Sequence, residues 1–293
     1  MIDPLGTERP AAGISLSRRG FVSLVGSALG ATHFPRFRPP KKSRPNLIAQ
    51  FLDSLDPTQT KAICHPSNHP RRLAATLTRS LTSPTIADLT PVQRHLCGRI
   101  FKSLCRSEGY ERFLRQMRED SGGFANYHPA LFGEPGTDEP FEWVLAGRHV
   151  ILRADGHSPD GSTFNGTVFF GHSATTENLW RSPGDRAETL FKSLSRRQHI
   201  QAIESGLGWN ELDGHQRVIL AAMFGDLTDP FRGLTREGMP ESGRLIFDEP
   251  HSDREAPWNS WRLRSLSLSC YYHAKPHVHV WLDVAAREPL PSA

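Results

Sequence analysis

The chain has 293 residues, of which 37% are hydrophobic and 23% are charged, a composition typical of a globular protein with a sizeable core. The net charge of +4 comes from the N-terminal segment, because residues 1–45 contain eight lysines and arginines but only two acidic residues. Residues 46–293 contain the remaining 27 basic and 29 acidic residues. This balance argues against a broad basic surface, so we predict that the body of the protein binds no nucleic acid.

The N-terminal segment contains "SRRGFVSLVGSALGA", in which Arg18 and Arg19 precede Phe21 and a short apolar run that ends in small residues. This order resembles a twin-arginine export signal. We therefore predict a signal peptide over residues 1–31 and a basic, proline-rich linker over residues 32–45. The resemblance implies that the twin-arginine export machinery delivers the protein to the periplasm or the extracellular space. The apolar run is shorter than the roughly 20 residues that a membrane-spanning helix needs, so we expect no stable transmembrane anchor.

A local pattern recurs four times along the body: a leucine stands four residues before a glutamine, and apolar residues follow at helical spacing. Each copy contains a residue that favours the N-terminus of a helix, namely Asp56, Thr90, Ser195 and Asp213. The uneven spacing of the copies argues against a solenoid and favours two similar helical pairs, one on each side of a central region. We predict helices over residues 46–64, 70–79, 91–120, 184–205 and 213–226.

The central region changes to the pattern of strands. The stretches "FEWVLAGRHVILRADG" (residues 141–156) and "STFNGTVFFGHSA" (residues 162–174) are rich in β-branched and aromatic residues. Glycine, proline and aspartate lie between them, as in turns. This combination predicts an antiparallel hairpin or meander.

A second group of strand patterns follows residue 240. Read as one strand, "LRSLSLSC" places Leu263 on the face opposite Leu268 and Cys270. We expect the two strand groups, about 141–174 and 243–284, to meet in one largely antiparallel sheet packed with helices from the N-terminal and middle segments. The predicted fold class is α+β. The expected domain covers residues 46–284, and residues 285–293 form a tail.

The stretch "KPHVHVWLD" near the C-terminus alternates apolar and polar residues. In a strand, Val278, Val280 and Leu282 would share the core face. His277, His279, Trp281 and Asp283 would share the other face. Two neighbouring imidazoles are suited to bind one metal ion, but they are equally compatible with a half-exposed polar face.

The order of motifs resembles that of the family known as domain of unknown function 3500, from about Asn46 to about Asp283. The stretches that carry the resemblance are "LDPTQ", "DLTPVQ", "RSEGYERFLRQM", "YHPALFGEP", "WVLAGRHVILR", "FFGHSA", "SLSRRQHIQAI" and "HVHVW". The chain resembles a divergent member, because Arg148 stands where the family has the first histidine of a Gly-His-His pair, while His149 matches the second. The resemblance implies a fold and motif positions but no reaction.

Four histidines and one carboxylate are the candidate site residues. We predict a metal site of His149, His277 and His279, which requires the two strand groups to be neighbours. Asp283 is a further candidate as fourth ligand or partner of a ligand, and His172 is a further candidate ligand. Three imidazoles would leave an open position on zinc, copper or iron.

Two functions remain open at this point. One is an exported metal-dependent enzyme, hydrolytic or oxidative. The other is an exported binding protein without catalysis, which holds an unknown small-molecule ligand on the same polar sheet face. The chain contains no phosphate-binding glycine loop and no Gly-x-Ser-x-Gly nucleophile motif that would favour another chemistry.

Overall fold

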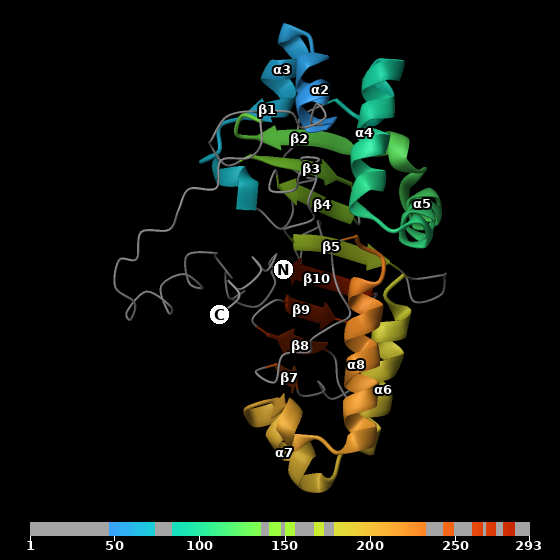
Figure 1. Ribbon diagram of the computed structural model, residues 1–293, viewed down its shortest axis with the longest axis vertical. Helices are drawn as coiled ribbons and strands as arrows, with labels where there is room; N and C mark the ends of the chain where they lie inside the picture. Colours follow the sequence, from blue (N-terminus) through green and yellow to red (C-terminus); the bar gives the residue numbers. More distant parts are fainter. Residues whose placement is uncertain are drawn as a thin grey trace, which may run out of the picture. The chain divides into compact units, whose positions relative to one another are not determined.

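The computed structural model describes the chain in stretches that all belong to one unit of residues 43–293 (Figure 1). These stretches are residues 47–73, 84–135, 141–147, 150–155, 167–172, 179–232, 243–248, 260–265, 268–273 and 278–284. The predicted signal peptide, linker and tail lie outside the described residues.

Within these stretches, one 10-stranded sheet runs in the order β1-β2-β3-β4-β5-β10-β9-β8-β7-β6. Its strands are β1 (Cys64–His65), β2 (His128–Phe132), β3 (Glu142–Ala146), β4 (Val150–Asp155), β5 (Thr167–His172), β6 (Leu207–Gly208), β7 (Arg244–Phe247), β8 (Ser260–Arg264), β9 (Leu268–His273) and β10 (Val278–Val284). Neighbouring strands are antiparallel except for β1 and β2.

The two predicted strand groups meet where β5 pairs with β10, with Val280 opposite Phe170 near the middle of the pair. The predicted α+β class and the predicted single, largely antiparallel sheet are therefore confirmed. Both groups are rich in β-branched and aromatic residues, which suit a sheet that is buried on at least one face.

One predicted strand was wrong in detail. The stretch around "LRSLSLS" is a hairpin, because the chain turns between β8 and β9 and the Ser265 N–H donates to the Leu268 carbonyl at 2.7 Å. The turn restarts the alternation, so Leu263 stands opposite Cys270 and shares its buried face. Alternation of side chains between the two faces of a sheet predicts their direction only within one uninterrupted strand.

The helices are α2 (Leu47–Asp53), α3 (Pro57–Ile63), α4 (Pro91–Leu104), α5 (Ser107–Ser121), α6 (Arg181–Ser193), α7 (Arg196–Glu204) and α8 (Gly214–Thr228), with 3-10 turns η1 (Pro70–Leu73), η3 (Ile86–Asp88), η4 (Phe124–Asn126) and η5 (Trp209–Glu211). No helix in the described part of the chain is long and apolar enough to cross a membrane.

All four predicted N-caps are confirmed. Asp56, Thr90, Ser195 and Asp213 begin α3, α4, α7 and α8, and each accepts from the backbone N–H of the glutamine three residues later. Each glutamine side chain in turn accepts from the backbone N–H of its cap residue, which completes a capping box.

Three predicted helices each divide into two. Residues 46–64 divide before Asp56 and residues 184–205 divide before Ser195, because each cap residue adopts an extended backbone and starts a new helix. Residues 91–120 divide at Cys105, which is also extended, with φ −110° and ψ 151°. The helical spacing of apolar residues continues across each break, so this spacing alone does not show where one helix ends and the next begins.

The capping glutamines also join the helices in pairs. The Gln93 amide donates to the Gln59 side chain at 2.7 Å and to the Ser54 carbonyl at 2.7 Å. The equivalent Gln216 amide donates to the Gln198 side chain at 3.2 Å and to the Ser193 carbonyl at 3.0 Å. The predicted similarity of the two helical pairs therefore extends to individual hydrogen bonds.

The two halves of the sheet are similar to each other, as the two helical pairs are. Counted outward from the central β5–β10 pair, the strands appear in the same chain order in both halves. The β3–β4 hairpin closes with a Gly147 N–H to Val150 carbonyl bond of 2.7 Å, which matches the bond that closes β8–β9. Trp143 and Trp261 occupy matching positions, and both are fully buried. The two halves thus share strand order and these local features, but β1 is parallel to β2 whereas β6 is antiparallel to β7.

A reciprocal contact joins the ends of α4 and α8, which lie on the same side of the sheet in Figure 1. The Arg106 N–H donates to the Pro230 carbonyl at 3.0 Å, and the Arg232 N–H donates to the Leu104 carbonyl at 2.9 Å. The Arg106 and Arg232 guanidinium groups then donate to the Phe231 and Cys105 carbonyls, respectively. We call this set of bonds the arginine clasp.

Candidate functional site

Strand β10 carries side chains of different character on its two faces. Val278, Val280 and Leu282 are 7%, 0% and 0% exposed and belong to the core. His279 and Trp281 alternate with them and are half-buried. The alternation predicted from "HVHVWLD" is confirmed for these side chains.

Strand β9 adds two rings beside them, because directly opposite residues in antiparallel strands point to the same face. His273 stands opposite His279, and Tyr271 stands opposite Trp281. The ring centroids are 6.5 Å apart for the two histidines and 5.1 Å apart for Tyr271 and Trp281. Along the strands, His279 and Trp281 are 5.8 Å apart. We call these four side chains the ring cluster.

An ion pair borders the ring cluster at β7 and β8. The Arg262 Nη2 donates to the Asp248 carboxylate at 2.6 Å, and the Ser260 hydroxyl donates to the same carboxylate. The Arg262 guanidinium carbon lies 5.9 Å from the centroid of the Tyr271 ring. Partial burial lowers the pKa of the His273 imidazole, and the Asp248 carboxylate opposes this shift. The His273 ring is therefore mainly neutral at pH 7, with one ring nitrogen able to accept.

We call the ring cluster and its bordering ion pair the polar face. The opposite face of the same strands is packed. Tyr272, between two members of the ring cluster, points to that opposite face, where its hydroxyl lies so close to Gly184 of α6 that a Cβ there would be 2.3 Å away. Burial raises the pKa of the Tyr272 hydroxyl above its usual range. The polar face is thus the side of β9 turned away from α6.

In the first half of the sheet most of the corresponding face is buried, although His65 on β1 and His128 on β2 are half-buried there. Ile151 and Trp281 share this face, because both stand opposite Phe169. Glu142 is 4% exposed and accepts from Arg72 at 2.8 Å and from Arg153 at 3.3 Å. A carboxylate held by two guanidinium groups is a structural arrangement, so we assign Glu142 a structural role.

The predicted metal ligands are only partly placed. His149 and His277 lie outside the described residues. Of His172 and Asp283 only the backbone is described: His172 stands opposite Val278, and Asp283 lies on β10. Only the His279 side chain is described, on the polar face. The three-histidine site therefore stays a prediction.

Among the described residues, no group of three histidine, cysteine, aspartate or glutamate side chains could hold a metal ion. The structure does add His273, which the sequence reasoning missed. "CYYHA" also alternates, so reading it as a strand paired with "HVHVW" across a short turn would have placed His273 beside His279.

The cysteines offer no nucleophile. All four are free thiols, and Cys97, Cys105 and Cys270 are buried. Burial raises the pKa of these three thiols above the usual range and that of Cys64 to about 11. A thiol with such a pKa is almost fully protonated at pH 7, which leaves it a poor nucleophile.

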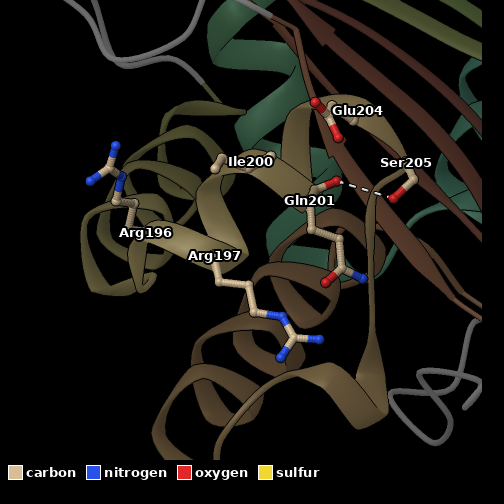
Figure 2. A pocket seen from close by; sticks show the side chains of 6 residues that line it. All are labelled: Arg196, Arg197, Ile200, Gln201, Glu204 and Ser205. Atoms are coloured by element: carbon tan, nitrogen blue, oxygen red, sulfur yellow. Dashed lines mark hydrogen bonds between the residues drawn. The ribbon is translucent and has the colours of Figure 1, made fainter.

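A second surface feature is a hollow of about 530 Å³ along α7. Figure 2 shows its lining, which comes from the one helix and the residue after it: Arg196, Arg197, Ile200, Gln201, Glu204 and Ser205. The Arg196 and Arg197 side chains extend in different directions, so no set of polar groups converges there. The polar face is therefore the stronger candidate site.

A family model described as protein of unknown function (DUF3500) matches residues 41–205. Because the match spans more than half of the chain, the chain belongs to this family. The resemblance inferred from the motifs is confirmed over this range, while the stretch that contains "HVHVW" lies beyond it. No curated protein and no solved structure matches the chain.

Proposed function

Starting from membership of this family of unknown function, we propose that the chain is an exported protein that binds a small ring-shaped ligand on the polar face. The observation that carries the proposal is the ring cluster: four half-buried rings lie side by side, bordered by an ion pair, on the side of β9 turned away from α6. Such a surface offers both apolar contact area and hydrogen-bonding groups.

The chemistry of the polar face indicates the type of ligand. Stacking on Tyr271 or Trp281 would contribute roughly 0.5–1.5 kcal/mol beyond the apolar area buried. The imidazoles of His273 and His279 can exchange hydrogen bonds with hydroxyl or carboxyl groups. A sugar or an aromatic compound with polar substituents satisfies both requirements.

Saturation-transfer NMR with the full chain tests this proposal. The probes are one panel of mono- and disaccharides and one of aromatic carboxylic acids. We expect at least one compound to receive saturation, and Trp281→Ala to abolish the signal. Trp209→Ala is the matched control, because Trp209 is half-buried like Trp281 and has the Arg217 guanidinium 5.9 Å from its ring. If no compound binds, or binding survives Trp281→Ala, the proposal is wrong.

A metal-dependent enzyme, hydrolytic or oxidative, is the second candidate function. The observation that favours it is the position of His279 on the polar face, where the predicted site of His149, His277 and His279 requires it. Metal analysis of the purified protein tests this function. We expect one zinc, copper or iron ion per chain and its loss in His149→Gln, whereas a metal-free protein that gains none on titration would contradict it.

Export by the twin-arginine route is also a proposal, supported by the motif of Arg18, Arg19 and Phe21. These residues lie outside the described part of the chain. With both arginines replaced by lysine, the precursor should accumulate in the cytoplasm. A reporter fusion that still crosses the membrane at the original rate would refute this assignment.

A further inference from the structure

We propose that His273 and His279 together bind one divalent transition-metal ion. The inference rests on the same polar face as the proposed ligand site, but on a different pair of its side chains. It also differs from the three-histidine prediction, because His273 lies on β9 and both side chains are described.

The geometry of the β9–β10 pair supports a shared ion. His273 and His279 are direct cross-strand partners, and the Cβ atoms of such partners lie about 4.5–5.5 Å apart. Their ring centroids are 6.5 Å apart with the planes inclined at 69°. An ion bound to nitrogen at about 2.0–2.1 Å from each ring requires only a modest rotation of the side chains. The strand backbones need not move.

The surroundings of the pair favour a cation. The Asp248 carboxylate acts electrostatically on His273, and the charge of Arg262 is offset by its 2.6 Å contact with that carboxylate. Both histidines are half-buried, so water can reach an ion held between them. Two imidazoles completed by water suit zinc, nickel and copper(II) better than calcium or magnesium, which prefer oxygen ligands.

The neighbouring rings would hold the ligands in position. Trp281 lies 5.8 Å from His279, and Tyr271 lies 6.4 Å from His273, measured between centroids. Each histidine thus has an aromatic neighbour two residues away on its own strand. This packing restricts the ring rotamers and lowers the entropy that metal binding must overcome.

Titration of the full, chelator-stripped chain with Zn²⁺ in a calorimeter, and with Cu²⁺ followed by electron paramagnetic resonance, tests the inference. We expect one ion per chain with two nitrogen ligands in the copper spectrum. His273→Gln and His279→Gln should each weaken binding at least tenfold. The control is His95→Gln, because His95 is exposed on α4. Circular dichroism confirms the folding of each variant.

Paramagnetic broadening by Cu²⁺ in the unmutated chain gives a second readout that needs no variant, because the NMR signals of Tyr271 and Trp281 should broaden first. If no ion binds, or if stoichiometric binding survives the double variant, the inference is wrong. If metal binding fails while ligand binding still depends on Trp281, only this inference falls. If the metal binds and no ring-shaped ligand does, only the proposed ligand function falls.

Discussion

Replacing Gln93 by methionine tests how strongly the capping glutamines hold the helices together. The side chain is 2% exposed and makes four hydrogen bonds. Its amide group donates to the Ser54 carbonyl and to Gln59, each at 2.7 Å. Its oxygen accepts from the Thr90 backbone at 2.9 Å and from the Gln59 amide at 3.2 Å. Methionine has a similar volume, so the change removes hydrogen bonds and leaves little cavity.

Four hydrogen bonds with a net value of about 0.5–1.5 kcal/mol each predict a loss of about 2–6 kcal/mol in the free energy of unfolding. The Ser54 carbonyl would lose its hydrogen-bond donor. Because Ser54 is half-buried, water would replace that donor only in part. Gln59→Met is the comparison variant: it removes the two bonds with Gln93 and the bond from the Asp56 N–H but leaves the bonds of Gln93 to Ser54 and Thr90, so we expect a smaller loss of about 1.5–4.5 kcal/mol.

Urea unfolding followed by circular dichroism measures these losses. Because Gln216 repeats the same bonds in the second half, Gln216→Met should cost as much as Gln93→Met. A loss below about 1 kcal/mol for Gln93→Met with an unchanged m-value would refute the hydrogen-bond reasoning. A large loss for Gln93→Met but none for Gln216→Met would refute the equivalence of the two halves.

Three further changes test other parts of the fold. Gly184→Ala should destabilise the protein by more than about 2 kcal/mol, because its Cβ would lie 2.3 Å from the Tyr272 hydroxyl; a thermal midpoint within 1–2 °C of the original, on the order of 0.5 kcal/mol, would contradict this. Hydrogen bonds from the backbone and from a side chain lower the pKa of Glu211, so its contribution to stability is present above pH 4.5 and lost as pH falls through the lowered pKa. The stability difference between the original chain and Glu211→Gln should therefore shrink on acidification, and a difference constant from pH 7 to 3 argues against it. Arg106→Ala and Arg232→Ala should each cost about 1 kcal/mol in unfolding experiments, and clearly unequal losses would show that the arginine clasp is not reciprocal.

The candidate site was partly predictable from local pattern. The alternation in "HVHVWLD" assigned Val280 to the core and His279 to the polar face, because side-chain direction in a strand depends only on parity within that strand. The pairing of His279 with His273 is not contained in this pattern, because it depends on how β9 and β10 align across the sheet. The position of the turn at Ser265 decides which residues face each other across β8 and β9.

The sequence by itself determined the features that involve a few consecutive residues. The four N-caps are such features, because a cap side chain and the N–H that it accepts from lie within one helical turn. The strand-rich character of both groups and the neutral charge of the body were also readable without a structure.

Only the tertiary structure decided which distant groups meet. The Gln59–Gln93 and Gln198–Gln216 pairs, the arginine clasp and the central β5–β10 pairing join segments far apart in the chain. It also decided that the same sheet face is buried around Glu142 but half-exposed at His279. These outcomes depend on the total free energy of burying the core, to which all segments contribute. A local sequence pattern does not contain this total.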